Sequence, residues 1–207
     1  MKRKILLLAA FAICASVAAS GTIAFFTASE TAHNIITTGS AKIAIIEKTL
    51  DDAGNEIDFP QTGISGLMPG ESADKIVTVE NTGESDVWVR VLVNIAISEP
   101  GDPITNPLIK NLPLEIDVNG VPTPVVTLDI DDTNWIYEDG YYYYTSALMP
   151  GVITPPLFTK VSFAKETGDA YQGCKILVDV TVEAVQTANN GIPAGSDVTD
   201  VPVWTNP

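Results

Sequence analysis

The chain has 207 residues and a formal net charge of −15, from 26 acidic and 11 basic residues. Such an acidic composition argues against nucleic acid and anionic lipid as partners, because both repel a negatively charged surface. Its two cysteines are Cys14 and Cys174, and only Cys174 lies beyond the first 24 residues, so the chain is not a disulfide-stapled module.

The first 24 residues have the composition of an export signal. Three basic residues occupy positions 2–4, an apolar run fills positions 5–19, and the small residues Thr22 and Ala24 precede Phe25. This order is typical of a secretory signal peptide. We predict that residues 1–24 are removed between Ala24 and Phe25, which changes the formal net charge from −15 to −18. The product is expected to be secreted, to the cell surface or an extracellular matrix, with no membrane contact after cleavage.

Two alternatives for this leader stay open. Positions 5–26 are long enough to cross a bilayer, so the leader can instead be retained as an anchor. Polar and small residues at positions 20–22 weaken that run, and no basic cluster follows it. Cys14 is a poor lipid-attachment site because Ile13, rather than a small residue, precedes it.

The segment 25–38 has the composition of a strand that lies ahead of the main domain. It has few charges, and it contains two leading aromatics and several strand formers: Phe25, Phe26, Thr27, Ile35 and Ile36. We predict that this donor segment adds to the open sheet edge of a neighbouring copy, as a polymerisation strand. The alternative is that it pairs within its own domain as an ordinary first strand.

Apolar residues alternate with polar ones along most of the chain after residue 40, a pattern that predicts β-strands. One long strand has one face made of Val87, Val89, Val91, Val93, Ile95 and Ile97, and a second has Ile176, Val178, Val180 and Val182. Shorter strands are expected at 41–47, 75–80, 114–118, 125–128, 135–138, 141–145 and 158–164. No helical pattern is evident outside the leader.

Turn residues separate these strands and set the expected fold class. Asn119-Gly120 and Asp139-Gly140 are typical of two-residue hairpins, because these residues tolerate positive φ. Pro122 and Pro124 place their strand at a sheet edge. The repeated Met-Pro-Gly at 68–70 and 149–151 indicates two matching corners. The sequence therefore predicts an all-β, antiparallel sandwich formed as a single domain by residues 39–207.

Residues suited to catalysis are scarce, and we predict no catalytic site and no cofactor. His33 is the single histidine and lies in the segment ahead of the domain, where a histidine-based triad is not expected. No HExxH sequence occurs. Cys174 has no second histidine to activate it and is interpreted as a small buried apolar residue.

Two acidic loops are weak candidates for calcium. Asp129, Asp131 and Asp132 offer carboxylate oxygens, but the loop lacks the glycine and distal glutamate of an EF-hand. The loop at 51–58 is a second candidate. In both, a solvated acidic loop is the simpler interpretation.

The tyrosines at 141–144 should alternate between faces, either as cross-strand pairs or, with Trp135 or Tyr137, as an aromatic patch for a partner or sugar.

Several segments taken in order resemble one family. The leader continues into GTIAFFT at 21–27 and NIITTG at 34–39, which is similar to proteins processed by the signal peptidase SipW. The body contains MPGE at 68–71, VTVENTG at 77–83, VWVRV at 87–91, DGYYYY at 139–144, MPG at 149–151, PLFT at 156–159 and TANN at 187–190. These segments resemble the TasA and camelysin family.

That resemblance implies an exported subunit with a jelly-roll-like β-sandwich that assembles into extracellular fibres of a biofilm matrix. Its expected partners are other copies of itself, a SipW-type signal peptidase and other matrix proteins. Camelysin has also been described as a neutral metallo-endopeptidase, which gives the alternative function. A single histidine outside the predicted domain offers no evident zinc site, so we predict a non-enzymatic protein. A monomeric surface adhesin is a third possibility.

Overall fold

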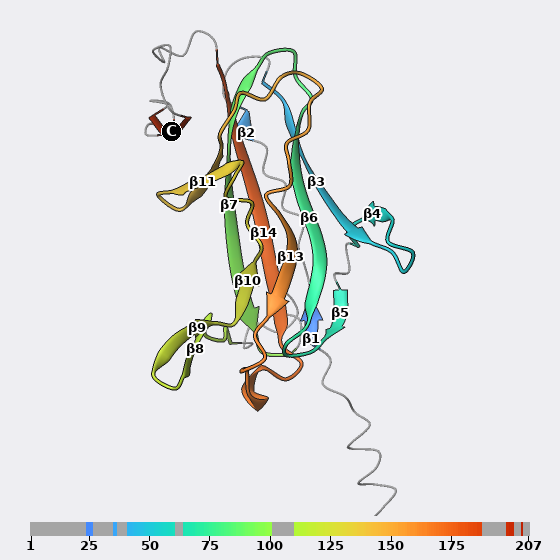
Figure 1. The fold of residues 1–207 in the computed structure, drawn as a ribbon, viewed down its shortest axis with the longest axis vertical. Coiled ribbons are helices and arrows are strands. Elements are labelled where there is room, and N and C mark those ends of the chain that lie inside the picture. The colour runs from blue at the N-terminus through green and yellow to red at the C-terminus, as the bar shows by residue number, and fades with distance from the viewer. Residues whose placement is uncertain are drawn as a thin grey trace, which may run out of the picture.

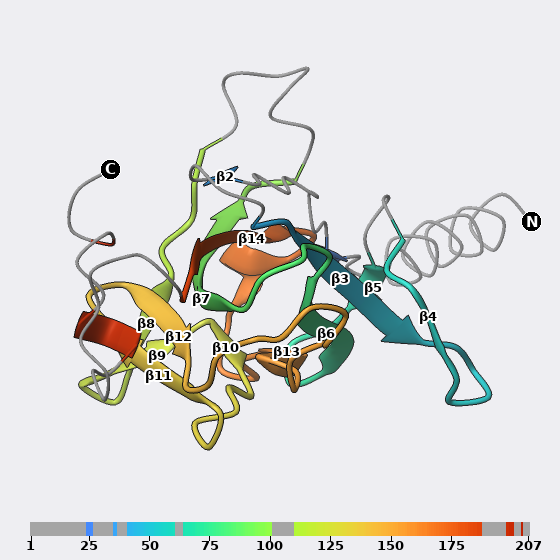
Figure 2. The same cartoon turned by 90° about the horizontal axis from the view of Figure 1, so that it is seen from above.

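Two β-sheets face each other across an apolar core, and their longest strands run along the longest axis of the molecule (Figure 1). The computed structural model describes residues 24–26, 35–36, 41–60, 64–100, 110–187, 198–200 and 204. Seen from above, β7 (Val87–Ser98) and β14 (Lys175–Gln186) lie on one side of the core, and β6 (Ser72–Asn81) and β13 (Phe158–Phe163) lie on the other (Figure 2). The prediction of an all-β sandwich is confirmed, whereas the jelly-roll arrangement stays a prediction.

The larger sheet has seven strands, in the order β11-β12-β7-β14-β1-β5, with β2 also paired to β14. Its strands are β1 (Ala24–Phe26), β2 (Ile35–Ile36), β5 (Ile64–Leu67), β7 (Val87–Ser98), β11 (Trp135–Glu138), β12 (Tyr141–Tyr144) and β14 (Lys175–Gln186). Its neighbouring strands are antiparallel except that β1 and β2 run parallel to β14. This is a departure from the antiparallel sandwich that the sequence predicts.

The second sheet has five strands in the order β10-β13-β6-β3-β4, and a separate hairpin forms a two-stranded sheet. The five strands are β3 (Ile43–Leu50), β4 (Glu56–Asp58), β6 (Ser72–Asn81), β10 (Val126–Leu128) and β13 (Phe158–Phe163). The hairpin consists of β8 (Glu115–Val118) and β9 (Val121–Pro124), and the described 3₁₀ helices are η1 (Asp169–Tyr171) and η2 (Val198–Asp200). Among the described residues, no helix is both long and apolar enough to cross a membrane.

Alternation along the two longest strands builds the core. On β7 the predicted face is buried at Val87, Val89, Val91 and Ile97 and half-buried at Val93 and Ile95. On β14 the predicted face is buried at Ile176, Val178, Val180 and Val182, and Ala184 continues it. The two strands pair along their whole length. Their alternation was therefore correctly interpreted, because each side chain that points inward is apolar.

The tight turns also form where they were predicted. Asn119 and Gly120 have φ of +56° and +84°, and Asp139 and Gly140 have +47° and +89°. Positive φ at both positions fits the twist of a two-residue hairpin. β9, which carries the two prolines, pairs only with β8 among the described strands and is an edge strand as expected.

Two Met-Pro-Gly turns, 68–71 and 149–152, close the two ends of β6. In each turn the methionine carbonyl accepts a hydrogen bond from the residue three positions later, at 3.0 and 3.1 Å. Gly70 and Gly151 have φ of +86° and +72°, which glycine adopts without strain. The first turn directly precedes β6, and in the second the Gly151 N–H donates to the carbonyl of Asn81, where β6 ends. The matching corners are thus confirmed.

Candidate functional site: the outer edge of β14

β14 is paired unequally along its two edges. One edge is fully paired with β7, at all twelve residues of β14. The other edge pairs with β1 at Lys175 and Ile176 and with β2 at Glu183 and Ala184. Among the described residues no strand pairs with the six positions between, 177–182. We call this second edge the β14 outer edge.

The registers of β1 and β2 on this edge differ by two residues. Eight residues separate Phe26 from Ile35, whereas only six separate their partners Ile176 and Glu183. A regular parallel ladder adds one residue on each strand for each step. The N-terminal segment therefore matches β14 at two separate places rather than as one uninterrupted strand.

The predicted processing and polymerisation residues lie at this edge. The bond between Ala24 and Phe25 falls within β1, Phe26 completes that strand, and Ile35 and Ile36 form β2. Thr27 and His33 lie outside the described residues, as does the leader up to residue 23. The pairing that the structure contains is within one chain, which corresponds to the alternative interpretation of this segment. Exchange between copies stays a prediction.

Asp179 lies in the middle of the stretch 177–182 and has an unsatisfied oxygen. Its Oδ1 is buried and has no hydrogen-bond partner in the part of the chain that the structure describes. Its neighbour across the ladder is Asn94 of β7. A buried carboxylate oxygen without a donor is unfavourable, by about 1–3 kcal/mol for a comparable polar group. A donor on a further strand at this edge would relieve that loss.

A row of three polar side chains crosses the outer face of the same sheet. Tyr143 of β12, Arg90 of β7 and Glu183 of β14 are in register on neighbouring strands. Arg90 Nε and Nη2 lie 2.7 and 2.6 Å from one oxygen of Glu183. The guanidinium lies between two aromatic rings, 4.0 Å from the centre of Tyr141 and 4.4 Å from that of Trp204. Burial alone would lower the pKa of Arg90, but hydrogen bonds with Tyr143 and Glu183 outweigh it and raise that pKa.

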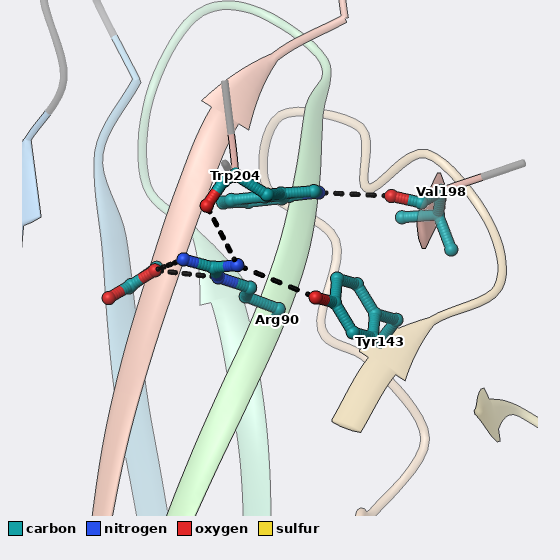
Figure 3. Close-up of polar contacts among 5 residues, drawn as sticks. Arg90, Tyr143, Val198 and Trp204 are labelled. Atoms are coloured by element: carbon teal, nitrogen blue, oxygen red, sulfur yellow. Dashed lines mark hydrogen bonds and ion pairs between the residues drawn. The ribbon is translucent and has the colours of Figure 1, made fainter. Parts of the chain in front are cut away.

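Trp204 attaches the C-terminal part of the chain to this row (Figure 3). Its indole N–H donates to the Val198 carbonyl at 3.0 Å, and its own carbonyl accepts a hydrogen bond from Arg90 at 3.4 Å. Together with Tyr143 and Val185, these two residues form a second apolar cluster, apart from the main core. Sequence analysis missed this cluster.

Two of the four tyrosines at 141–144 face the main core and two face away from it, as alternation predicts. Tyr142 and Tyr144 pack against the main core, where their rings contact Tyr137 and Trp135 of the neighbouring strand at 4.8 and 5.3 Å between centroids. Cross-strand pairing is therefore confirmed. The outward pair is Tyr141 and Tyr143, and it joins Arg90 and Trp204 instead of Trp135 or Tyr137.

The carboxylates of both calcium candidate loops make contacts within the protein: in the loop 51–58, Asp51 accepts hydrogen bonds from the backbone N–H groups of Ala53 and Asn55, at 2.9 and 2.8 Å. Asp129 accepts hydrogen bonds from the backbone N–H groups of Thr159 and Lys160, at 2.8 and 2.6 Å. Burial would raise the pKa of Asp129, but these bonds and one from the Thr159 hydroxyl outweigh it and lower that pKa. The Asn134 side chain, the largest influence on Asp131, donates to it at 2.7 Å and lowers its pKa. Calcium binding by Asp129, Asp131 and Asp132 stays the weaker of the two interpretations.

Few other groups in the described part of the chain carry reactive chemistry. Cys174 is fully buried, and burial raises the pKa of its thiol to about 11, as expected for a small apolar residue. No three His, Cys, Asp or Glu side chains gather there in a way that could hold a metal ion.

A charged pair that sequence analysis missed lies on the inner face of β6 and β3, where buried Lys75 contacts Glu47 at 2.6 Å beneath the Phe59 ring.

Comparison with known proteins finds no match among family models, curated proteins or solved structures. The strand arrangement at the β14 outer edge and the sequence itself are therefore the features that bear on the protein's function.

Proposed function

We propose that this protein is a secreted structural subunit that polymerises into extracellular fibres. In the fibre, the N-terminal segment of one copy occupies the β14 outer edge of the next. The observation that carries the proposal is that β14, central to the large sheet, has that edge paired by β1 and β2 and by no other strand among the residues that the structure describes. Both strands precede the rest of the fold in sequence.

Strand exchange of this kind makes no new type of contact. The segment that fills the edge within one chain can fill the same edge on a neighbour, because the two sites are identical. Since β1 and β2 precede the other strands in the chain, they can dissociate from β14 while every other described strand stays in its sheet. The contact is head-to-tail and leaves one segment and one edge unused at the ends, so it propagates as a filament.

Sequence features support the same function. The predicted leader directs the chain to the outside of the cell, where a matrix subunit acts. Phe25, Phe26, Ile35 and Ile36 are strand formers, as a segment that pairs with an edge requires. The resemblance to the TasA and camelysin family implies the same role.

Disulfide trapping tests the proposal, because Ile36 and Ala184 are register partners. Ile36→Cys combined with Ala184→Cys places two thiols on neighbouring strands, at a separation that a disulfide spans. The mature chain starting at Phe25 is allowed to form filaments, which electron microscopy records, and is then oxidised. We expect a ladder of covalent dimers, trimers and larger species on a non-reducing gel.

The matched control keeps Ile36→Cys but moves the second cysteine to Val178, on the same face of β14. That position lies roughly 20 Å from Ala184 along the strand, so no ladder should form. If the registered pair yields only monomers with an internal bond, the segment pairs within its own chain and exchange is refuted. If the wild-type mature chain forms no filaments, the fibre function itself is refuted.

A further inference from the structure

The donor segment 25–38 contains one residue with a charged side chain, Glu30, which lies outside the described residues. Strands β1 and β2, near its two ends, indicate which of its positions face the core. Phe26 pairs with Ile176 and Ile36 pairs with Ala184, and both of these β14 residues are buried. Side chains alternate between the two faces of a strand, so we expect Glu30, four residues after Phe26, on the core side as well.

Both registers on β14 give the same face for Glu30. Counted forward from Phe26 it falls opposite Val180, and counted back from Ile36 it falls opposite Val178. Val180 and Val178 are both buried on the core face of β14. A difference of two residues leaves a side chain on the same face of its strand. The docked segment therefore brings a carboxylate to the apolar core, which is unfavourable without a cationic partner.

The described part of the core contains one such cation, Lys75 of β6. It is the one residue with a charged side chain among the buried residues that the structure describes. Its Nζ lies 2.6 Å from a carboxylate oxygen of Glu47 and 4.3 Å from the centre of the Phe59 ring. An ammonium has three N–H donors, so Lys75 can bind a second carboxylate besides Glu47. The Glu47 side chain is 12% exposed, so water can share its charge.

β6 and β14 end at the same level of the sandwich, which allows heights in the two sheets to be compared. The Leu148 carbonyl accepts hydrogen bonds from the Asn81 side chain at the end of β6 and from the Val87 N–H. Val87 in turn pairs with Gln186, the last residue of β14. Asn81 and Gln186 therefore mark the same end of the two sheets.

The expected position of Glu30 faces Lys75 across the core. Lys75 lies six residues before Asn81, and Val180 lies six residues before Gln186, which is roughly 20 Å along each strand. Figure 2 shows β3 and β5 on the same side of β14, and β1 lies between β14 and β5 in the sheet. The donor segment thus lies opposite β6 and β3. Facing sheets are roughly 10 Å apart, a gap that a lysine and a glutamate side chain span together.

We infer that Glu30 of a docked segment forms an ion pair with Lys75 of the copy whose β14 outer edge the segment occupies. In the fibre that copy is the neighbour, so the inference rests on the proposed function and names the residues by which an edge recognises its segment. A segment with an apolar residue at this position lacks the charge that Lys75 attracts. A segment with a basic residue there is repelled, so the pair selects among partners.

Thermal unfolding of the filaments, followed by tryptophan fluorescence, tests the ion pair. Complete unfolding is measured because a segment that returns to its own edge regains the same contact. In the full mature chain, Glu30→Gln should lower the thermal midpoint by on the order of 5 °C, because the amide offers Lys75 no charge. Glu30→Lys should lower it further, since two ammonium groups then meet in the core.

Glu115→Gln is the matched control. Glu115 is exposed on the β8–β9 hairpin, so this change removes the same charge away from the donor segment. The midpoint of the control should stay within about 2 °C of the wild-type value.

A change in the body identifies Lys75 as the partner. Lys75→Met combined with Glu47→Gln removes both charges of the buried pair, which a core tolerates better than the loss of one. In that background Glu30→Gln should raise the midpoint instead of lowering it, because Glu30 then has no cation to meet. An equal fall in both backgrounds overturns the inference. A Glu30→Lys variant as stable as the wild type also overturns it, and that variant leaves the body unchanged.

The disulfide ladder keeps this test separate from the proposed function. If the ladder forms and Glu30→Gln has no more effect than Glu115→Gln, strand exchange stands and the ion pair is refuted. If no filaments form, the same variants are measured in the monomer. A reversal of sign there supports the ion pair within one chain, and the fibre function alone is refuted.

Discussion

Replacing Asn81 by alanine should lower the free energy of unfolding more than the same substitution at an exposed asparagine. Asn81 is fully buried at the end of β6. Its Nδ2 donates to the carbonyls of Ser85 and Leu148, at 2.9 and 2.8 Å, and its Oδ1 accepts from the Gly83 N–H at 2.9 Å. The side chain thus ties the end of β6 to the following loop and to the start of the 149–152 turn.

The expected loss follows from these three hydrogen bonds. A typical bond contributes 0.5–1.5 kcal/mol, so their removal should lower the free energy of unfolding by about 3 kcal/mol. For a domain of this size that corresponds to a fall of about 6–12 °C in the thermal midpoint. Urea unfolding of the monomeric mature chain, followed by tryptophan fluorescence, measures the loss.

Asn94→Ala is the matched control, because Asn94 is an exposed asparagine in the middle of β7. Its free energy of unfolding should stay within about 0.5 kcal/mol of the wild-type value. If Asn81→Ala loses as little as Asn94→Ala, the buried amide does not hold the two loops together and the reasoning is refuted.

Three further predictions concern the core and two titratable groups. Val91→Asp should cost several kcal/mol, on the order of 3–5, because Val91 is fully buried among apolar side chains, and a near-normal melting temperature would contradict this. Cys174 should react with a thiol reagent at pH 8 only after unfolding in urea, because it is buried and its pKa is raised to about 11, and rapid labelling of the native protein would show otherwise. The pKa of Asp129 is lowered in the folded protein, so its stabilisation should be complete well above pH 3.8 and disappear as the pH falls through the folded pKa. The stability gap between wild type and Asp129→Ala should therefore narrow between pH 6 and pH 2, and a constant gap would exclude this linkage.

Alternation and turn residues were enough to predict most of the body. On β7 and β14, every second residue is apolar, and burial follows that pattern directly. Asn-Gly and Asp-Gly determine their hairpins locally, since the positive φ values belong to those residues themselves. Short strands such as β4, with three exposed residues, carry no such pattern and were not predicted.

The arrangement at the β14 outer edge and the Arg90 row depends on long-range pairing. Composition alone predicted a strand at 25–38, but its partner follows only from the order of the sheet. Arg90 is 93 residues from Glu183 and 114 from Trp204, so nothing local connects them. A basic residue in an apolar strand was the available signal for both Arg90 and Lys75. Without the strand register, a basic residue in an apolar strand does not identify the group that it pairs with.

The direction of β14 also determines how a subunit would respond to tension. β1 and β2 lie parallel to β14, which runs along the longest axis of the molecule (Figure 1). A pull on the N-terminal segment along that axis loads its hydrogen bonds in shear, so that they must break together. A pull across the sheet would open them one at a time. A fibre joined through this edge should therefore resist stretching along its length far better than peeling from its side.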